Sequence, residues 1–258
     1  MYASANLALE VSKMSLLSSE LERYDRQMLI SGWGLEGQRK LKASKAAVLG
    51  IGGLGCLSSL YLAAAGVGRI ILIDKDGFKL SDLNRQILCW QKDLGLSKAE
   101  VAKKKLEALN SEIAVEALVA EITNDSVHDL IKDADIVVDG LDNWRTRFVI
   151  NSYCVAQGIP FIHAGVAGLQ GQMSTIIPGK GPCLRCIFPK DPPEVERFPV
   201  LGATPALLAA LQVTEAVKIV TGIGESLVGR ILFFDGKEMA FETVETERND
   251  KCPICGHL

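Results

Sequence analysis

The sequence predicts an α/β fold: a Rossmann-like, doubly wound, mostly parallel sheet followed by C-terminal antiparallel strands. The stretch from Ala46 to Asp74 has the pattern of a strand, a glycine turn, an apolar helix and a second strand. Strand and helix patterns then continue to alternate as far as Gly165, as they do in a parallel sheet. Beyond Gly165 the alternation stops, which predicts a C-terminal region of a different, antiparallel kind.

The N-terminal part precedes this unit. A polar, helix-biased segment over 19–38 contains RYDRQ, Arg23–Gln27, and a helix is expected over roughly Ser15–Ile30. Residues 1–20 are interpreted as an N-terminal extension, and residues 21–258 as a single domain that includes a metal-binding subregion over 179–258. The first twenty residues lack the basic start and the cleavage pattern of a signal peptide, so a cytoplasmic protein is expected.

The elements after the first unit follow from local signals. Ser97 is a candidate N-cap, with Glu100 three residues later, for a helix that runs to Asn110. A helix over Trp144–Gln157 should end at Gly158, and an apolar helix over Thr204–Thr221 carries a proline in its first turn. The remaining predicted elements are a short helix over Asp125–Lys132 and strands over Ile113–Val119, Asp135–Gly140, Phe161–Gly165, Gln170–Ile177, Arg230–Asp235 and Glu238–Thr246.

Composition narrows the function classes. The chain has 258 residues and a formal net charge of −3, which argues against a nucleic-acid platform. It has no run of about 20 apolar residues without a charge or glycine break, so no membrane span is expected.

The glycine turn predicts a nucleotide site. Glycines at 50, 52, 53 and 55 allow backbone N–H groups and a helix N-terminus to approach phosphate oxygens. Asp74 stands 24 residues after Gly50, at the end of the second strand, where a ribose-binding carboxylate is expected. The strand before the turn, the helix after it and the acid at the far end make this match much more specific than the glycines alone.

Four of the seven cysteines have metal-ligand spacing. They form two C-x-x-C pairs, Cys183 with Cys186 and Cys252 with Cys255. Four thiolates suit tetrahedral Zn²⁺ and leave no open position, so a structural zinc clip of four cysteines is expected. A redox pair or vacant thiols are the alternatives. The remaining cysteines, Cys56, Cys89 and Cys154, lie in apolar or helical contexts and are interpreted as buried small hydrophobes.

Several further motifs occur together in one order along the chain: RYDRQ at 23–27, GIGGLG at 50–55, IDKD at 73–76, SDLNRQ at 81–86, SKAE at 97–100, GLDNWRTR at 140–147, GPCLRC at 181–186 and CPIC at 252–255. Through these motifs the sequence resembles the MoeB/ThiF/HesA family, bacterial and archaeal relatives of ubiquitin-activating enzymes. The resemblance covers residues 21 to the C-terminus. It implies that ATP adenylates a carboxylate, most often the C-terminal glycine of a ubiquitin-like sulfur-carrier protein, and that pyrophosphate is released.

The resemblance also implies roles for individual residues. Asp74 matches the ribose-binding acid and Asp142 the acid that binds Mg²⁺, while Arg26 would reach across a homodimer interface into the partner's site. Asp76 and Asp82 belong to the same nucleotide-binding motifs. Arg85 and Lys98 supply positive charge beside the glycine turn, which the reaction requires because a carboxylate is a poor nucleophile toward an anionic α-phosphate.

Most of these side chains could instead have ordinary structural roles. Arg85 and Lys98 could be surface charges, Asp142 a helix cap, Asp76 a turn residue, and Arg23 and Arg26 partners in structural salt bridges. His163 is expected to be a core or pocket-wall histidine.

The chain departs from the family pattern at two places. Many relatives carry a further cysteine that bonds covalently to the carrier, but the matching segment, Ile187–Ala209, contains none. The reaction should therefore stop at the acyl-adenylate, which a separate sulfur donor or nucleophile then attacks. Relatives usually have asparagine in place of Asp82, and this extra carboxylate would either help to bind Mg²⁺ or perturb ATP binding.

Three alternative functions remain at this point. A scaffold without the cysteine could adenylate a small-molecule carboxylate in cofactor biosynthesis, as HcgE does with the guanylylpyridinol of the Fe-hydrogenase cofactor. The glycine turn also occurs in NAD(P)-dependent oxidoreductases, although Arg26, Arg85, Lys98 and Asp142 have no evident role in hydride transfer. A non-catalytic binding module is the third alternative.

Overall fold

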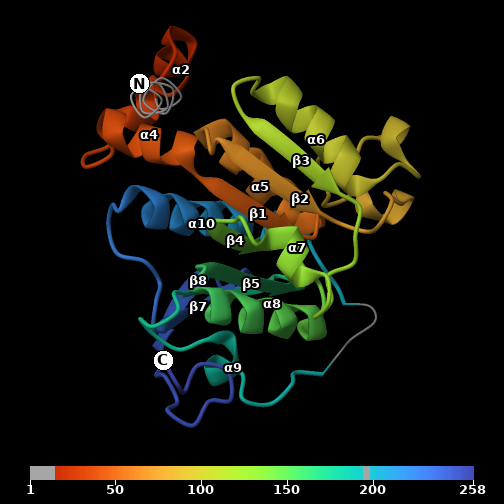
Figure 1. Cartoon of the computed structure of the whole chain (residues 1–258). Coiled ribbons are helices and arrows are strands. Elements are labelled where there is room, and N and C mark those ends of the chain that lie inside the picture. The colour runs from red at the N-terminus through yellow and green to blue at the C-terminus, as the bar shows by residue number, and fades with distance from the viewer. Residues whose placement is uncertain (1–14, 194–197) are drawn as a thin grey trace.

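The computed structural model describes residues 15–193 and 198–258 (Figure 1). Its eight described strands form one sheet in the order β3-β2-β1-β4-β5-β6-β7-β8. Strands β3, β2, β1, β4 and β5 pair in parallel, and β5, β6, β7 and β8 pair antiparallel. The fold class predicted from the sequence is therefore confirmed. The strands span Lys45–Leu49 (β1), Arg69–Ile73 (β2), Ala114–Leu118 (β3), Ile136–Asp139 (β4), Phe161–Ala167 (β5), Gln170–Ile176 (β6), Arg230–Asp235 (β7) and Ala240–Glu245 (β8).

Helices cover both faces of the parallel half. Along β1, Ala46 and Val48 belong to one buried cluster, while Ala47 and Leu49 belong to another on the opposite face. Strands buried on both faces read as continuous apolar runs, which explains why the strand patterns were recognisable in the sequence. The first cluster packs under α4 (Gly34–Ala43), α5 (Gly53–Ala65), α6 (Lys98–Leu109) and α10 (Ala203–Thr221); the second packs under α7 (Val127–Ile131) and α8 (Trp144–Gln157).

Several predicted boundaries are confirmed. Helix α8 has the predicted limits, and Gly158 ends it in the left-handed conformation. Helix α6 begins after Ser97, whose side chain accepts a hydrogen bond from the backbone N–H of Glu100. Residues 78–91, for which the sequence predicts a loop or an irregular helix, contain the short 3-10 helix η1 (Leu80–Asp82), and η2 (Gln91–Asp93) follows.

The single helix predicted over Ser15–Ile30 is wrong. The structure has two short helices, α2 (Ser18–Arg23) and α3 (Asp25–Met28), separated at Tyr24. The Tyr24 side chain is almost fully buried, and its hydroxyl accepts a hydrogen bond from Asn110. This tertiary contact draws the backbone out of helical geometry, and a local helical pattern cannot reveal it. Of the predicted extension over 1–20, residues 1–14 lie outside the described residues.

Within the described residues, α10 is the one helix long and apolar enough to cross a membrane by composition. Half of its apolar window is buried inside the fold. Gln212 on α10 is fully buried, accepts a hydrogen bond from Ser58, and donates to the carbonyls of Asp139 and Ile162. The apolar composition of α10 is thus explained by its packing between α5 and the sheet.

The chain termini of the described fold lie far apart. Figure 1 shows α2 at one end of the molecule and the C-terminal segment at the other, beside α9 (Leu184–Ile187). Because the C-terminal segment lies beside α9, the two predicted cysteine pairs come together.

The hydrogen bonds of Gln212 generate a stability prediction. Gln212→Leu leaves the carbonyls of Asp139 and Ile162 without their donor in the core, so we expect a loss of about 2–4 kcal/mol in the free energy of unfolding. Denaturant titration measures it. Thr214→Ala, an exposed change on the same helix, should shift stability by less than about 0.5 kcal/mol. Equal unfolding midpoints for the two variants would contradict this account of α10.

Candidate functional site

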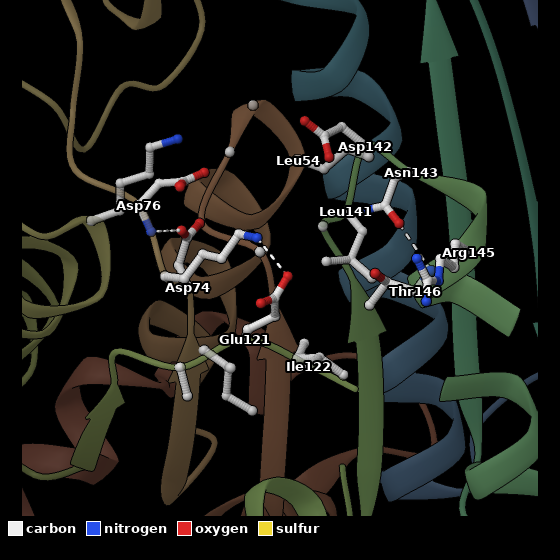
Figure 2. A pocket seen from close by; sticks show the side chains of 18 of the residues that line it. Leu54, Asp74, Asp76, Glu121, Ile122, Leu141, Asp142, Asn143, Arg145 and Thr146 are labelled. Carbon is white, nitrogen blue, oxygen red and sulfur yellow. Dashed lines mark hydrogen bonds and ion pairs between the residues drawn. The ribbon is translucent and has the colours of Figure 1, made fainter. Parts of the chain in front are cut away.

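A cavity of about 840 Å³ opens at the carboxyl ends of the parallel strands. Parallel α/β sheets place their ligands at this edge. The glycine turn after β1, the acids after β2 and the segment after β4 all line the cavity. Figure 2 shows Asp74, Asp76 and Glu121 on one side, with Asp142, Asn143 and Arg145 on the other.

The glycine turn builds the floor of the cavity. Gly50 has φ +84, and a Cβ at this position would lie 2.8 Å from the carbonyl oxygen of Gly140. Helix α5 begins at Gly53 without a side-chain cap, so its N-terminal backbone N–H groups are available to an anion. Gly50, Gly52 and Gly53 line the cavity. Gly55 does not, because it packs its Cα against the turn: a Cβ there would lie 1.8 Å from the carbonyl oxygen of Gly50.

Asp74 is fixed by backbone donors. Its Oδ2 accepts from the N–H of Ile51 at 2.6 Å, and its Oδ1 from the N–H of Asp76 at 2.8 Å. Burial raises the pKa of Asp74, while these two hydrogen bonds act in the opposite direction. The carboxylate is thereby held at the end of β2, facing the cavity, where it can accept hydrogen bonds from a sugar hydroxyl. Asp76 also lines the cavity, and its carbonyl accepts from the N–H of Lys98.

Two cations and a buried acid meet beside the turn. Arg85 and Lys98 line the cavity, and both pair with Asp82, at 3.4 and 3.8 Å. Asp82 is only 5% exposed and is not among the lining residues. It lies behind the two cations rather than among the groups that a ligand would touch.

Asp142 is exposed at the mouth of the cavity. The cap of α8 is the neighbouring residue, Asn143, whose Oδ1 accepts from the N–H of Thr146 at 2.9 Å. Capping therefore does not explain Asp142, and the helix-cap alternative is wrong. Its carboxylate stands beside the glycine turn without a structural role in α8, which suits it to bind a cation.

The cavity wall that follows β3 was not predicted from the sequence. Residues 120–125 line the cavity, and Glu121 accepts a hydrogen bond from Lys75 at 2.6 Å (Figure 2). Their position after a parallel strand was the available signal. Their residue types alone carried none.

A second cavity, of about 630 Å³, adjoins the first. The two share Leu54, Leu141, Asp142, Val166 and Phe198 as lining residues. Most of the remaining wall of the second cavity comes from the antiparallel strands β6, β7 and β8. Two ligands, one in each cavity, would therefore meet at Asp142.

A buried charged group lies beneath this boundary. Asp139 accepts from Arg147 Nε at 2.8 Å and pairs with His163 Nδ1 at 2.7 Å. Burial raises the pKa of Asp139, but Arg147 and His163 outweigh it and hold the pKa below its ordinary value. Burial lowers the pKa of His163. His163 is fully buried, as expected for a core histidine.

The four predicted metal ligands lie together. The sulfur atoms of Cys183, Cys186, Cys252 and Cys255 all lie within 4.8 Å of one another. Sulfurs around a tetrahedral Zn²⁺ stand roughly 3.8 Å apart, and Cys183 and Cys252 are at 3.7 Å. Asn151, in the middle of α8, accepts from the N–H of Leu184 at 2.8 Å and so ties this cluster to the helix that begins beside Asp142.

The other three cysteines are buried. Cys56, Cys89 and Cys154 are at most 4% exposed, and burial raises the pKa of Cys56 to about 12. A thiol so hard to ionise is a poor nucleophile. These cysteines pack as small hydrophobes, as the sequence predicted.

Arg26 lies apart from the cavity. It stands exposed on α3 and does not line the site of its own chain. Arg23, by contrast, donates to the carbonyl of Leu109 and has a structural partner. The action of Arg26 in a partner's site stays a prediction.

Known proteins share this architecture. A model described as the ThiF family matches residues 24–254. The chain is 40% identical over 248 residues to the SAMP-activating enzyme E1 of Haloferax volcanii, covering 94% of this chain and 92% of that protein. It is 38% identical over 253 residues to the sulfur carrier protein adenylyltransferase of Thermus thermophilus, covering 94% and 93%. The crystal structure of E. coli MccB with ATP is similar at a TM-score of 0.83 and 29% identity, covering 91% of this chain and 75% of that one.

The cysteine cluster generates a prediction about metal content. We expect about one Zn²⁺ per chain by elemental analysis, and Cys255→Ser should lower both the zinc content and the melting temperature, because the clip holds the C-terminus to α9. Cys89→Ala, outside the cluster, should keep the metal. Full folding stability after complete removal of zinc by a chelator would refute the structural role.

Proposed function

Because the chain belongs to the ThiF family, we propose that it uses ATP to adenylate a carboxylate and releases pyrophosphate. One observation carries this proposal: a single cavity combines the uncapped N-terminus of α5, the cations Arg85 and Lys98, and the exposed acid Asp142. These groups suit a triphosphate and its metal, and none of them serves a hydride transfer. The oxidoreductase alternative therefore loses its support.

The nucleotide is assigned along the floor of the first cavity. Its phosphates lie at the glycine turn and the N-terminus of α5, where backbone N–H groups and the helix dipole favour anions. Arg85 and Lys98 offset the phosphate charge, and Asp74 and Asp76 accept from the ribose hydroxyls. Asp142 fits Mg²⁺, which binds through one or two carboxylates together with substrate phosphates. The ion would neutralise the polyphosphate and favour departure of its outer part.

The acid substrate is assigned to the second cavity. Its carboxylate would approach from the common boundary at Asp142 and attack the α-phosphorus, forming a carboxylate–phosphorus bond while the bond to pyrophosphate breaks. The protein's contribution is to hold the two reactants in line and to stabilise the charge of the leaving group. A cavity walled largely by strands suits an extended peptide tail better than a compact metabolite.

The substrate class we propose is the C-terminal glycine of a ubiquitin-like sulfur-carrier protein. The activities for which the Haloferax and Thermus relatives are named support it. Segment Ile187–Ala209 has no cysteine to accept the carrier, so the acyl-adenylate is the final product on this protein. A separate sulfur donor or nucleophile then takes it over. We expect the protein to be cytoplasmic, because it would use ATP and needs reduced cysteine thiolates to bind zinc.

A homodimer completes the proposed site. Arg26 is exposed on α3, outside its own cavity, and its planar guanidinium suits bidentate binding of phosphate in the partner's site. Each active site would then contain groups from two protomers.

Removal of the metal-binding acid should abolish turnover. Asp142→Ala should lower the rate of carrier-dependent pyrophosphate release at least about 100-fold, because the polyphosphate charge is no longer neutralised. Asp129→Ala, an exposed acid on α7, is the control and should keep the wild-type rate. A wild-type rate for Asp142→Ala would reject the proposed role. Release with a small-molecule acid but with no carrier protein would redirect the substrate assignment.

The in-trans role of Arg26 can be tested by mixing inactive variants. Arg26→Ala and Lys98→Ala should each be inactive alone, and subunit exchange between them should restore about a quarter of wild-type activity. Half of the re-formed dimers are then mixed, and each mixed dimer has one intact site. Mixtures that remain inactive although exchange is demonstrated by mass spectrometry would mean that Arg26 acts within its own chain, and wild-type activity of Arg26→Ala alone would mean that it has no role.

A further inference from the structure

Two aspartate–lysine pairs repeat along one face of α6. Asp82 pairs with Lys98, and Asp93 pairs with Lys105, seven residues further along the helix. Each aspartate is the last residue of a 3-10 helix, η1 or η2, and each accepts at 2.9 Å from the backbone N–H of the residue before that helix. Both acids are buried, at 5% and 7% exposed. The local geometry of the two acids is therefore the same.

The two aspartate–lysine pairs differ in whether they border the nucleotide cavity. Lys98 lines the nucleotide cavity, whereas neither Asp93 nor Lys105 does. Lys105 instead lies over the ring of Trp90 and donates to the carbonyl of Leu88. The Asp93–Lys105 pair thus has the same construction without the ligand site, which makes it a natural control.

Asp82 also holds the other polar groups of the cavity wall. It accepts from Gln86 Nε2 at 2.9 Å and pairs with Arg85 Nη2 at 3.4 Å. An ionised carboxylate only accepts hydrogen bonds, so it fixes the amide of Gln86 with Nε2 turned toward itself. Gln86 and the two cations that Asp82 holds all line the cavity. One buried acid therefore contacts three groups that line the cavity.

We propose that Asp82 is a positioning residue and a built-in counter-ion of the polyphosphate site. It orients Arg85 and Lys98, and its negative charge offsets part of theirs, so that the site binds polyphosphate less tightly and lets pyrophosphate leave. This inference rests on the proposed function and deepens it. It assigns Asp82 an action through its neighbours, in place of the direct nucleotide contact predicted from the sequence.

The effect should grow with the charge of the ligand. Asp82 lies behind the cations that line the cavity. At a separation of several ångströms from a bound polyanion, one unit charge should change its affinity on the order of tenfold. Pyrophosphate and ATP carry several negative charges near the cations, whereas AMP carries fewer. A purely structural role for Asp82 would not produce this ranking.

Asp82→Asn removes the charge and keeps the shape. The asparagine oxygen can accept from Lys79 N–H. Its amide can donate to Gln86 Oε1 once the Gln86 amide turns over, which pairs an atom that is buried and has no partner within the described residues. Asp93→Asn makes the same change at the control pair. If Asp82→Asn does not fold, Asp82→Ser serves in its place, because it also removes the charge and keeps a polar side chain.

The test is calorimetric titration of the full-length protein with pyrophosphate, ATP and AMP. Asp82→Asn should bind pyrophosphate and ATP about tenfold more tightly than wild type, and AMP less than about threefold more tightly. In turnover, its KM for ATP and its inhibition constant for pyrophosphate should fall while kcat does not rise. Asp93→Asn should bind all three ligands as wild type does.

The possible failures are distinguishable. Unchanged or weaker binding of pyrophosphate by Asp82→Asn would overturn the counter-ion role and leave the adenylation proposal standing. Equal tightening by Asp93→Asn would also overturn it, since the effect would then be general. If wild type binds ATP and Asp82→Asn tightens it, but no carboxylate releases pyrophosphate, the adenylation proposal fails while the counter-ion survives. Absence of any nucleotide binding by wild type would overturn both.

Discussion

The site depends on the close approach of two backbone turns. Where β1 enters α5 and where β4 ends, the chain packs backbone against backbone: a Cβ at Gly140 would lie 2.2 Å from the carbonyl oxygen of Gly50. The same contact forbids a side chain at Gly55. It gives the cavity a floor of backbone groups, open to phosphate, and it brings Asp142, two residues beyond Gly140, beside the N-terminus of α5. Larger residues at these glycines would push the two turns apart and separate the proposed metal ligand from the phosphates.

The two halves of the sheet contribute to different cavities. The parallel half carries the first cavity, the proposed nucleotide site, at its carboxyl edge, and the antiparallel half supplies three strands to the wall of the second cavity. Helix α8 connects them. Its N-terminus follows Asp142, and its residue Asn151 binds the backbone beside the cysteine cluster. Zinc in that cluster would therefore fix the C-terminus and, through α8, the acid at the boundary of both cavities.

Features encoded locally were predictable from the sequence, and features that depend on distant contacts were not. The glycine turn, the Ser97 cap, the limits of α8 and the cysteine spacing each follow from residues near one another in the chain. The break at Tyr24 arises from burial against Asn110, which lies 86 residues away. The place of Asp82 behind Arg85 and Lys98 depends on how η1 packs against α6, and the wall over 120–125 is recognisable only once the strand order is known.

In the proposed reaction, this protein joins the α-phosphate of ATP to a carboxylate. The most direct test supplies a ubiquitin-like carrier ending in glycine together with ATP labelled either in its α- or in its γ-phosphate. We expect the α label to appear on the carrier in a bond that hydroxylamine cleaves, while the γ label leaves as pyrophosphate. Transfer of the γ label to the carrier, or release of the γ label as single phosphate, would contradict it.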